Sequence, residues 1–178
     1  MKPYVITIAR QYGSGGRTVG KMLARKLGIP FYNREIITMA SEDSGVNAML
    51  FSDERLKGDF LTRLRAHYHG NTPVPNDSSK SYLKDEALFA YQVKIIRRLA
   101  DQGPCVMIGR CADYALADNP NLLSIFIHAP MDVRIARVAK RQNLTPEKAR
   151  QLILKTDKRR ASYYEYYSSQ KWGAVESY

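Results

Sequence analysis

The stretch from Tyr4 to Leu27 constrains the fold most, because it combines a strand-like run, a glycine-rich turn and a helix-like run in direct succession. Its first part, Val5 to Ala9, is apolar and rich in β-branched residues, which is typical of a buried strand. After the turn, Gly13 to Gly16, apolar residues recur at helical spacing, and Gly28 stands where a helix would end. The sequence therefore predicts a strand and a helix joined by a glycine loop.

The glycine loop is a candidate phosphate site. Glycines let backbone N–H groups converge on an anion, and the N-terminus of a helix adds a positive field. The standard phosphate loop is G-x-x-x-x-G-K-[ST]. With Gly16 as the last glycine, Arg17 replaces the lysine and Thr18 is the hydroxyl residue, whereas Gln11 stands at the first glycine. The residues predicted to bind phosphate are Gly13, Ser14, Gly15, Gly16, Arg17 and Thr18. The alternative is a turn that only packs a strand against a helix.

Length, cysteines and charge narrow the class of protein. The 178 residues suit a single domain, 1–178. No apolar run is long enough to span a bilayer and no signal segment opens the chain, so we expect a cytoplasmic protein without a membrane partner. Cys105 and Cys111 lie in or beside one strand-like run, which favours packing thiols. The net charge of +11 indicates an anionic partner, either phosphorylated small molecules or, as a weaker alternative, nucleic acid.

Strand-like and helix-like segments alternate along the chain. We expect strands at Ile29–Tyr32, Cys105–Ile108 and Leu122–Ile127. Helices are expected at Arg34–Ala40 (capped by Asn33), Tyr82–Asp101, Ala112–Ala117 and Asp132–Gln142, and from Thr145-Pro146-Glu147 through Leu154 into Lys155–Arg160. Short helices are expected between Ser41 and Lys80, around a loop at Asn71–Ser79. This alternation predicts an α/β fold with a parallel central sheet.

The carboxyl ends of parallel strands meet at one edge of a sheet, where ligands bind. That edge would hold Gly13–Thr18, Asn33-Arg34, Gly109-Arg110 and His128. Further cations follow the last strand, namely Arg134, Arg137, Lys155, Lys158, Arg159 and Arg160. A basic helical pair that closes over phosphates would exclude water and supply arginines, so we predict a lid there.

Each of these features has a simpler alternative. Arg110 could be a solvated charge at a strand end, and Lys155 to Arg160 could be a solvated helix face. The tyrosines of Tyr163–Tyr167 are more often packing residues than a platform for a nucleotide ring, and His128 is better interpreted as structural. We expect neither a dedicated zinc site nor a serine-based triad.

The order of the motifs resembles the cytidylate kinase-like proteins, which are P-loop relatives of the nucleoside monophosphate kinases. The matching segments are ITIARQYGSGGRTVGKMLARKLGIPFYNREII, GPCVMIGRCADYAL, IFIHAPMDVRIARV and LILKTDKRRASYYEYY. The resemblance implies a P-loop NTPase-type three-layer fold with a parallel central sheet, a helical acceptor-binding insertion within residues 34–100 and a helical lid within residues 134–170. It also implies a kinase that uses ATP and Mg²⁺ to phosphorylate a small anionic acceptor, most readily a nucleoside monophosphate.

The resemblance further assigns roles to single residues. It implies that Thr18 touches Mg²⁺, that Arg110 holds the acceptor phosphate and that Asp113 is a further acceptor ligand. Arg134 and Arg137 match lid-base arginines, with Asp157 and Arg159 on the far side of the lid. The residues expected to be catalytic are Arg17, Arg110, Arg137 and Arg159; those expected to bind ATP are Gly13–Thr18 and Arg134; those expected to bind the acceptor are Asn33, Arg34, Arg110 and Asp113.

The sequence departs from cytidylate kinases at defined positions. Arg17 replaces a lysine, Ile108 and Asn33 replace acidic residues, and Asp113 lies two residues further from Arg110 than the acid of their Gly-Arg-Asp signature. Cytidylate kinases also continue into a last strand and helix, so we expect a truncated chain or a differently built sheet edge here. Two alternatives stay open: a kinase for another small molecule, and a non-catalytic nucleotide- or nucleic-acid-binding protein on the same fold. The oligomeric state is left open.

Overall fold

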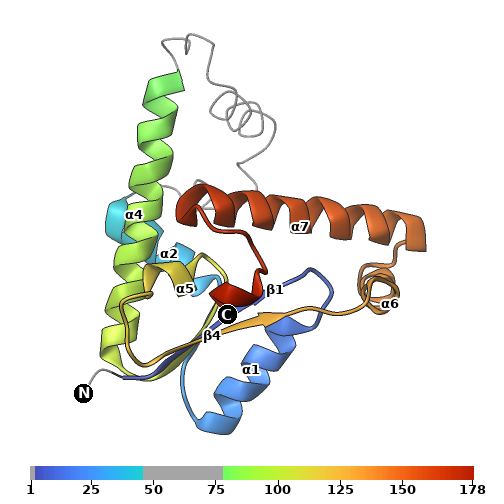
Figure 1. The fold of residues 1–178 in the computed structure, drawn as a ribbon, viewed down its shortest axis with the longest axis horizontal. Coiled ribbons are helices and arrows are strands. Elements are labelled where there is room, and N and C mark those ends of the chain that lie inside the picture. Colours follow the sequence, from blue (N-terminus) through green and yellow to red (C-terminus); the bar gives the residue numbers. More distant parts are fainter. Residues whose placement is uncertain (1–2, 46–77) are drawn as a thin grey trace. The chain divides into compact units, whose positions relative to one another are not determined.

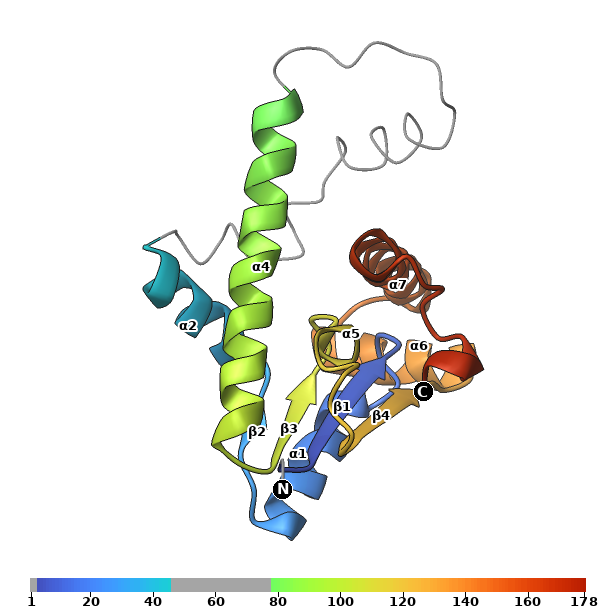
Figure 2. The ribbon, with the colours of Figure 1, turned by 60° about the vertical axis from the view of Figure 1, so that its left-hand side comes forward.

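The computed structural model describes residues 3–45 and 78–178, with the backbone alone for residues 78–85. Its sheet has the order β2-β3-β1-β4, formed by β1 (Val5–Arg10), β2 (Phe31–Tyr32), β3 (Cys105–Ile108) and β4 (Leu122–Ile127) (Figure 2). Every neighbouring pair is parallel, and Ile8 of β1 lies beside Ile108 of β3 and Ile125 of β4. The predicted α/β fold with a parallel central sheet is confirmed.

By its internal contacts the chain divides into two compact units. The first comprises residues 1–33 and 96–178 and contains the sheet with α1 (Gly16–Leu27), α5 (Ala112–Ala115), α6 (Met131–Gln142), α7 (Pro146–Ser168) and the short 3-10 helix η3 (Val175–Ser177) (Figure 1). The second comprises residues 34–95 and contains α2 (Glu35–Ser44) and most of α4 (Ser78–Gln102).

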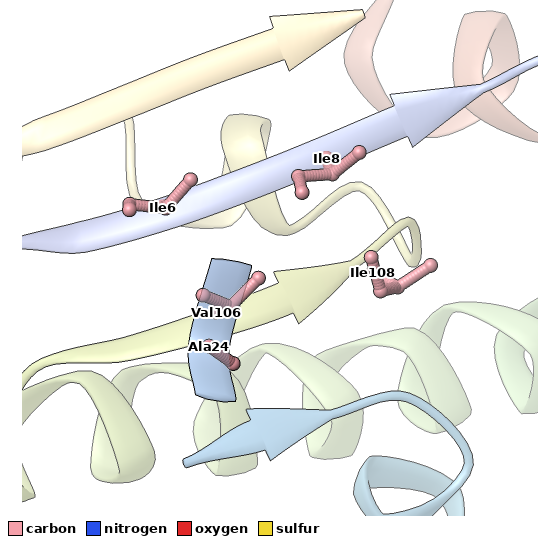
Figure 3. Packing of buried hydrophobic residues seen from close by; sticks show 5 residues of the cluster. All are labelled: Ile6, Ile8, Ala24, Val106 and Ile108. Atoms are coloured by element: carbon pink, nitrogen blue, oxygen red, sulfur yellow. The ribbon is translucent and has the colours of Figure 1, made fainter. Parts of the chain in front are cut away.

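The core of the first unit lies between the sheet and α1. Ile6 and Ile8 of β1 cluster with Val106 and Ile108 of β3, and Ala24 of α1 lies over them (Figure 3). A Cβ at Gly20 would stand 2.7 Å from Ile108 Cδ1, so a glycine at this position lets α1 approach the sheet closely. β3 is wholly apolar and β1 is apolar except for Thr7 and Arg10, which suits their central places, because both faces of a central parallel strand are covered.

The C-terminal segment packs against β4. Phe126 lies 5.1 Å from the Trp172 ring in an edge-to-face arrangement and 5.2 Å from the Tyr178 ring. A Cβ on Gly173 would stand 3.0 Å from the Phe126 ring, so glycine permits this close approach. The outer strand β4 is therefore covered in part by aromatic residues from the end of the chain.

Helices α6 and α7 form the basic pair that the sequence predicted. They pack through Val138, Ala149 and Ile153, which are fully buried. The predicted start of α7 is confirmed, because Thr145 caps the helix by accepting a hydrogen bond from Lys148 N and Pro146 is its first residue. The helix continues through Ser168, so the tyrosine segment is part of α7 rather than a separate element.

Several predicted boundaries were wrong by a few residues. Arg34, not Asn33, is the N-cap of α2, and that helix ends at Ser44 rather than Ala40. Strand β2 begins at Phe31 because the Ile29 N–H bonds to the carbonyl oxygen of Ala24 at the end of α1. α5 ends at Ala115 rather than Ala117. Most of the predicted helices and loop between Ser41 and Lys80 lie outside the described residues, although Ser78 and Ser79 are helical.

The second unit has its own buried positions and a surface ion pair. Ile36, Ile37 and Ala40 of α2 are buried. Lys94 Nζ of α4 donates to Asp43 Oδ2 of α2 at 2.8 Å. Across both units, no helix in the described ranges combines the length and the apolar character needed to cross a membrane.

Candidate phosphate site

The glycine loop joins β1 to α1, and two of its glycines are required by the backbone. Gly13 and Gly15 have φ values of +81° and +91°, in the left-handed region that L side chains rarely adopt. Gly15 is the N-cap of α1; it has no side chain to cap the helix, and the first turn contains no acidic residue. The first-turn N–H groups thus lack a side-chain cap, which leaves the N-terminus of α1 suited to an anion.

A largely buried ion pair holds the backbone of this loop. Asp157 Oδ1 of α7 accepts a hydrogen bond from the Tyr12 N–H at 2.6 Å. Asp157 Oδ2 accepts another from Arg134 Nη1 of α6 at 2.5 Å, and Arg134 Nη1 also lies 3.4 Å from the Tyr12 carbonyl oxygen. The Arg134 side chain is 6% exposed and that of Asp157 16%. Arg134 therefore supports the loop through Asp157, and its predicted contact with ATP stays a prediction.

Other arginines of α6 and α7 also contact the loop. Arg137 Nη1 donates to the Gly13 carbonyl oxygen at 2.6 Å and remains exposed. Arg160 Nη1 donates to the Arg10 carbonyl oxygen at 2.9 Å. The guanidinium groups of Arg141 and Arg160 lie 5.3 Å and 5.5 Å from the centre of the Tyr12 ring. The pair of helices thus presents positive charge to the glycine loop in this structure.

Arg110 lies in an unusual turn after β3. Gly109, Arg110 and Cys111 have φ values of +65°, +65° and +52°, so two non-glycine residues follow a glycine in the left-handed region. Each such non-glycine residue costs about 1–2 kcal/mol. Backbone strain of this kind is concentrated at functional sites. Because β3 lies beside β1 in the sheet, the turn is at the same carboxyl edge as the glycine loop.

Asp113 lies in a buried cluster on α5. Asp113 is 8% exposed, and its carboxylate atom Oδ2 has no hydrogen-bond partner among the described residues. Burial raises the pKa of Asp113, while the hydroxyls of Tyr164 and Tyr178 and nearby backbone N–H groups oppose that rise. Burial and the Asp113 charge also raise the pKa values of Tyr164 and Tyr178. The predicted contact of Asp113 with the acceptor stays a prediction.

We expect Asp113→Asn to remove a pH dependence of stability. The native pKa of Asp113 lies above the ordinary value of about 3.9. At pH values between these two pKa values, Asp113 is protonated in the folded protein and ionised in the unfolded chain, so the folded protein binds more protons. The free energy of unfolding of the wild type should therefore fall as pH rises through the raised native pKa, by about 1.4 kcal/mol for each pH unit that separates the native pKa from the unfolded one. In Asp113→Asn this fall should be absent, so the variant should be at least as stable as the wild type at neutral pH.

Urea unfolding at a series of pH values from about 4 upward measures this effect. Asp118→Asn is the matched control, because Asp118 is exposed just after α5 and its replacement removes a charge without changing a buried site. Parallel stability curves for the wild type and Asp113→Asn would contradict the expectation.

The remaining predicted residues are spread over both units. Asn33 is buried directly after β2, whereas Arg34 belongs to the second unit. Arg17 and Thr18 are exposed in the first turn of α1. Arg159 is half-buried on α7, and its Nε is buried without a hydrogen-bond partner among the described residues. Lys155, Lys158 and His128 are exposed.

Arg10 and Tyr12 also contribute to the loop, which the sequence patterns did not predict. Arg10 ends β1 and its carbonyl oxygen binds Arg160, while the Tyr12 hydroxyl accepts from Gln142 Nε2 at 2.5 Å. The sequence did carry a signal for Arg10. A charged residue is unexpected at the end of an apolar strand, and Arg10 stands there, six residues before Gly16 of the glycine loop. The partners of both residues are more than 100 positions away along the chain, so only the fold shows these contacts.

The chain is similar to known proteins over nearly its whole length. The model of the cytidylate kinase-like family matches residues 5–178. A curated relative, the cytidylate kinase of Methanopyrus kandleri, is 27% identical over 170 residues, which covers 90% of this chain and 74% of the relative. A crystal structure of an uncharacterized protein from Eubacterium ventriosum is similar with a TM-score of 0.69 and 29% identity, covering 99% of this chain and 84% of that one.

Proposed function

Because the chain belongs to the cytidylate kinase-like family, we propose that it is an ATP-dependent kinase that transfers a phosphoryl group to a small anionic acceptor. A nucleoside monophosphate is the first candidate, because the curated relative is named a cytidylate kinase. We place this activity in the cytoplasm, where ATP is available.

One observation carries the proposal: the uncapped N-terminus of α1 and the Arg137 guanidinium meet at the same glycine loop. The Arg137 side chain binds the Gly13 carbonyl oxygen, and Arg137 Nη1 lies 3.3 Å from the place where a Gly15 Cβ would stand. Oriented N–H groups beside an exposed cation form the arrangement that binds phosphates. A structural turn would need neither the uncapped amides nor the exposed guanidinium.

In the proposed reaction the protein positions charges and forms no covalent bond. An acceptor oxygen attacks the γ-phosphorus, the bond from that phosphorus to the bridging oxygen breaks, and ADP leaves. The glycine loop would hold the donor phosphates. Arg110, on the strained turn after β3, would bind the acceptor phosphate, and Arg137 and Arg159 would neutralise charge on the transferred group.

The first turn of α1 offers a place for Mg²⁺ only together with the nucleotide. Thr18 presents an exposed hydroxyl there, and the Asp157 carboxylate is already bonded to the Tyr12 N–H and Arg134. Thr18 would therefore be the protein ligand, with the phosphates supplying other oxygens. When bound, Mg²⁺ neutralises phosphate charge during transfer.

The test is ATP consumption with Mg²⁺ against a panel of nucleoside monophosphates and other small anionic acceptors. Gly15→Val is the variant that should abolish ATP binding, because its φ of +91° strains a branched side chain and its Cβ would stand 3.3 Å from Arg137 Nη1. Gly28→Ala is the matched control at the other end of α1. Its φ of +65° is also in the left-handed region, but a Cβ there would stand in open space, so Gly28→Ala should retain ATP binding.

Turnover with one acceptor, lost in Gly15→Val and kept in Gly28→Ala, would establish the kinase and name its substrate. ATP binding without turnover for any acceptor would favour a non-catalytic nucleotide-binding protein. The net charge of +11 keeps one further alternative open, because it suits nucleic acid. Oligonucleotide binding that falls steeply with salt, in the absence of ATP binding, would support that alternative.

A further inference from the structure

Gly16 is a glycine for a different reason from its neighbours in the loop. Gly13 and Gly15 have positive φ values, but Gly16 is the first residue of α1 and is not among the positive-φ residues. A Cβ at Gly16 would stand 2.6 Å from Arg10 Cβ and 3.0 Å from Arg10 Cγ. The missing side chain at position 16 therefore makes room for the side chain of Arg10.

The far end of the same arginine requires a second glycine. A Cβ on Gly109 would overlap Arg10 Nη1 and would stand 3.2 Å from Arg10 Cζ. The Arg10 side chain therefore runs from the start of α1 to the turn that carries Arg110. Its own backbone is held by β1 and by the hydrogen bond from Arg160 Nη1 to its carbonyl oxygen. The result is a guanidinium at the carboxyl edge of the sheet, beside Gly109 in the turn that carries Arg110.

The start of α1 changes how the phosphate motif aligns with this chain. If the last glycine of G-x-x-x-x-G-K-[ST] is Gly15, the N-cap of the helix, then Arg10 stands at the first glycine, Gly16 at the lysine position and Arg17 at the [ST] position. Thr18, one residue later in the first turn of α1, then supplies the hydroxyl proposed for Mg²⁺. In this alignment a cation, Arg10, stands where the standard motif has its first glycine, and a glycine, Gly16, stands where the motif has its lysine. The alternative alignment, with Gly16 as the last glycine, puts the exposed Arg17 at the lysine position instead.

We propose that Arg10 supplies the phosphate-binding cation that a lysine supplies in the standard loop, and that Gly16 and Gly109 are the two small residues that allow it. The inference rests on the proposed function, because it assigns the donor phosphates of ATP to this side chain. Arginine binds phosphate bidentately, and from this position it would contact the group that passes from ATP to the acceptor.

Substitutions at positions 10, 16 and 17 test this role of Arg10. We expect Arg10→Met to weaken binding of MgATP by about ten- to a hundredfold, the effect of losing a hydrogen bond to a charged group, and Arg17→Met to weaken it less. Arg25→Met, on the exposed last turn of α1, is the matched control and should bind as the wild type does. Calorimetric titration with MgATP measures the affinities, and melting without nucleotide shows whether each variant is folded.

The decisive variant restores the first glycine and the lysine of the standard motif, while Arg17 remains at its [ST] position. Gly16→Lys alone should destabilise the protein, since the new side chain overlaps that of Arg10. The double variant Arg10→Gly with Gly16→Lys should fold and regain most of the wild-type affinity for MgATP. This double variant tests the role of Arg10 even if Arg10→Met does not fold.

Three results would overturn the inference. If Arg10→Met binds MgATP like the wild type while Arg17→Met does not, Arg17 is the loop cation and the proposed kinase function still holds. If the double variant folds but does not bind MgATP, Arg10 does not take the role of the lysine in the standard loop. If the wild type itself does not bind MgATP, the proposed function fails together with the inference.

Discussion

Replacing Asp157 with alanine should lower the free energy of unfolding by about 3–5 kcal/mol, the usual cost of breaking a buried ion pair. The change leaves the buried guanidinium of Arg134 without its carboxylate and removes the acceptor of the Tyr12 N–H. Asp157→Asn should cost less, because its amide oxygen can still accept from the Tyr12 N–H. Denaturant unfolding of the wild type and both variants measures these losses.

The ion pair between Lys94 and Asp43 provides the matched control. It has a similar length of 2.8 Å, but the Lys94 side chain is 63% exposed, so Asp43→Ala should cost no more than about 1 kcal/mol. A loss in Asp157→Ala as small as that in Asp43→Ala would show that the buried pair does not hold the loop in place. Replacing both Arg134 and Asp157 with apolar residues of similar volume should recover much of the stability, because no unpaired charge then remains.

Arg110 should be essential for turnover yet unfavourable for stability. Arg110→Ala and Arg110→Gly should both lower kcat/KM for the acceptor by about a hundredfold or more, the effect of losing charge-assisted, bidentate hydrogen bonds to the acceptor phosphate. Their stabilities should differ, because alanine keeps the strain of φ +65° and glycine removes it. We expect Arg110→Gly to be more stable than Arg110→Ala by about 1 kcal/mol.

Turnover and thermal melting of the same two proteins separate the side chain from the backbone. A structural role for the Arg110 side chain predicts that both variants lose stability and that activity falls only in proportion to the unfolded fraction. Arg110→Lys is the conservative replacement and should regain part of the activity, because a lysine keeps the charge but not the bidentate geometry. Full activity in Arg110→Ala would remove Arg110 from the proposed site.

Local patterns were sufficient to predict the elements of the first unit. The apolar runs of β1, β3 and β4, the helix stop at Gly28 and the capped start of α7 at Thr145 follow from composition and from the chemistry of single residues. The errors lie at boundaries such as that of β2, where a hydrogen bond between Ile29 and Ala24 competes with strand pairing. Such competition depends on geometry that neighbouring residues in the sequence do not reveal.

Contacts between distant residues decided which charges surround the glycine loop. From the sequence alone, Arg134 and Arg137 are equivalent members of one basic helix face. In the structure Arg134 is buried against Asp157, whereas Arg137 is exposed and binds the Gly13 carbonyl oxygen. The packing of α6 on α7 separates their environments, because the turn of the helix directs one side chain toward α7 and leaves the other at the surface.

The sequence by itself determined that this chain has a parallel α/β fold with a glycine loop between its first strand and helix, because hydrophobic periodicity and glycine placement are local properties. Only the tertiary structure decided which arginines support the loop, which remain exposed beside it, and why position 16 carries no side chain. The reason is physical: burial, ion pairing and steric overlap depend on distances between residues such as Arg10, Gly16 and Gly109, and the fold sets those distances.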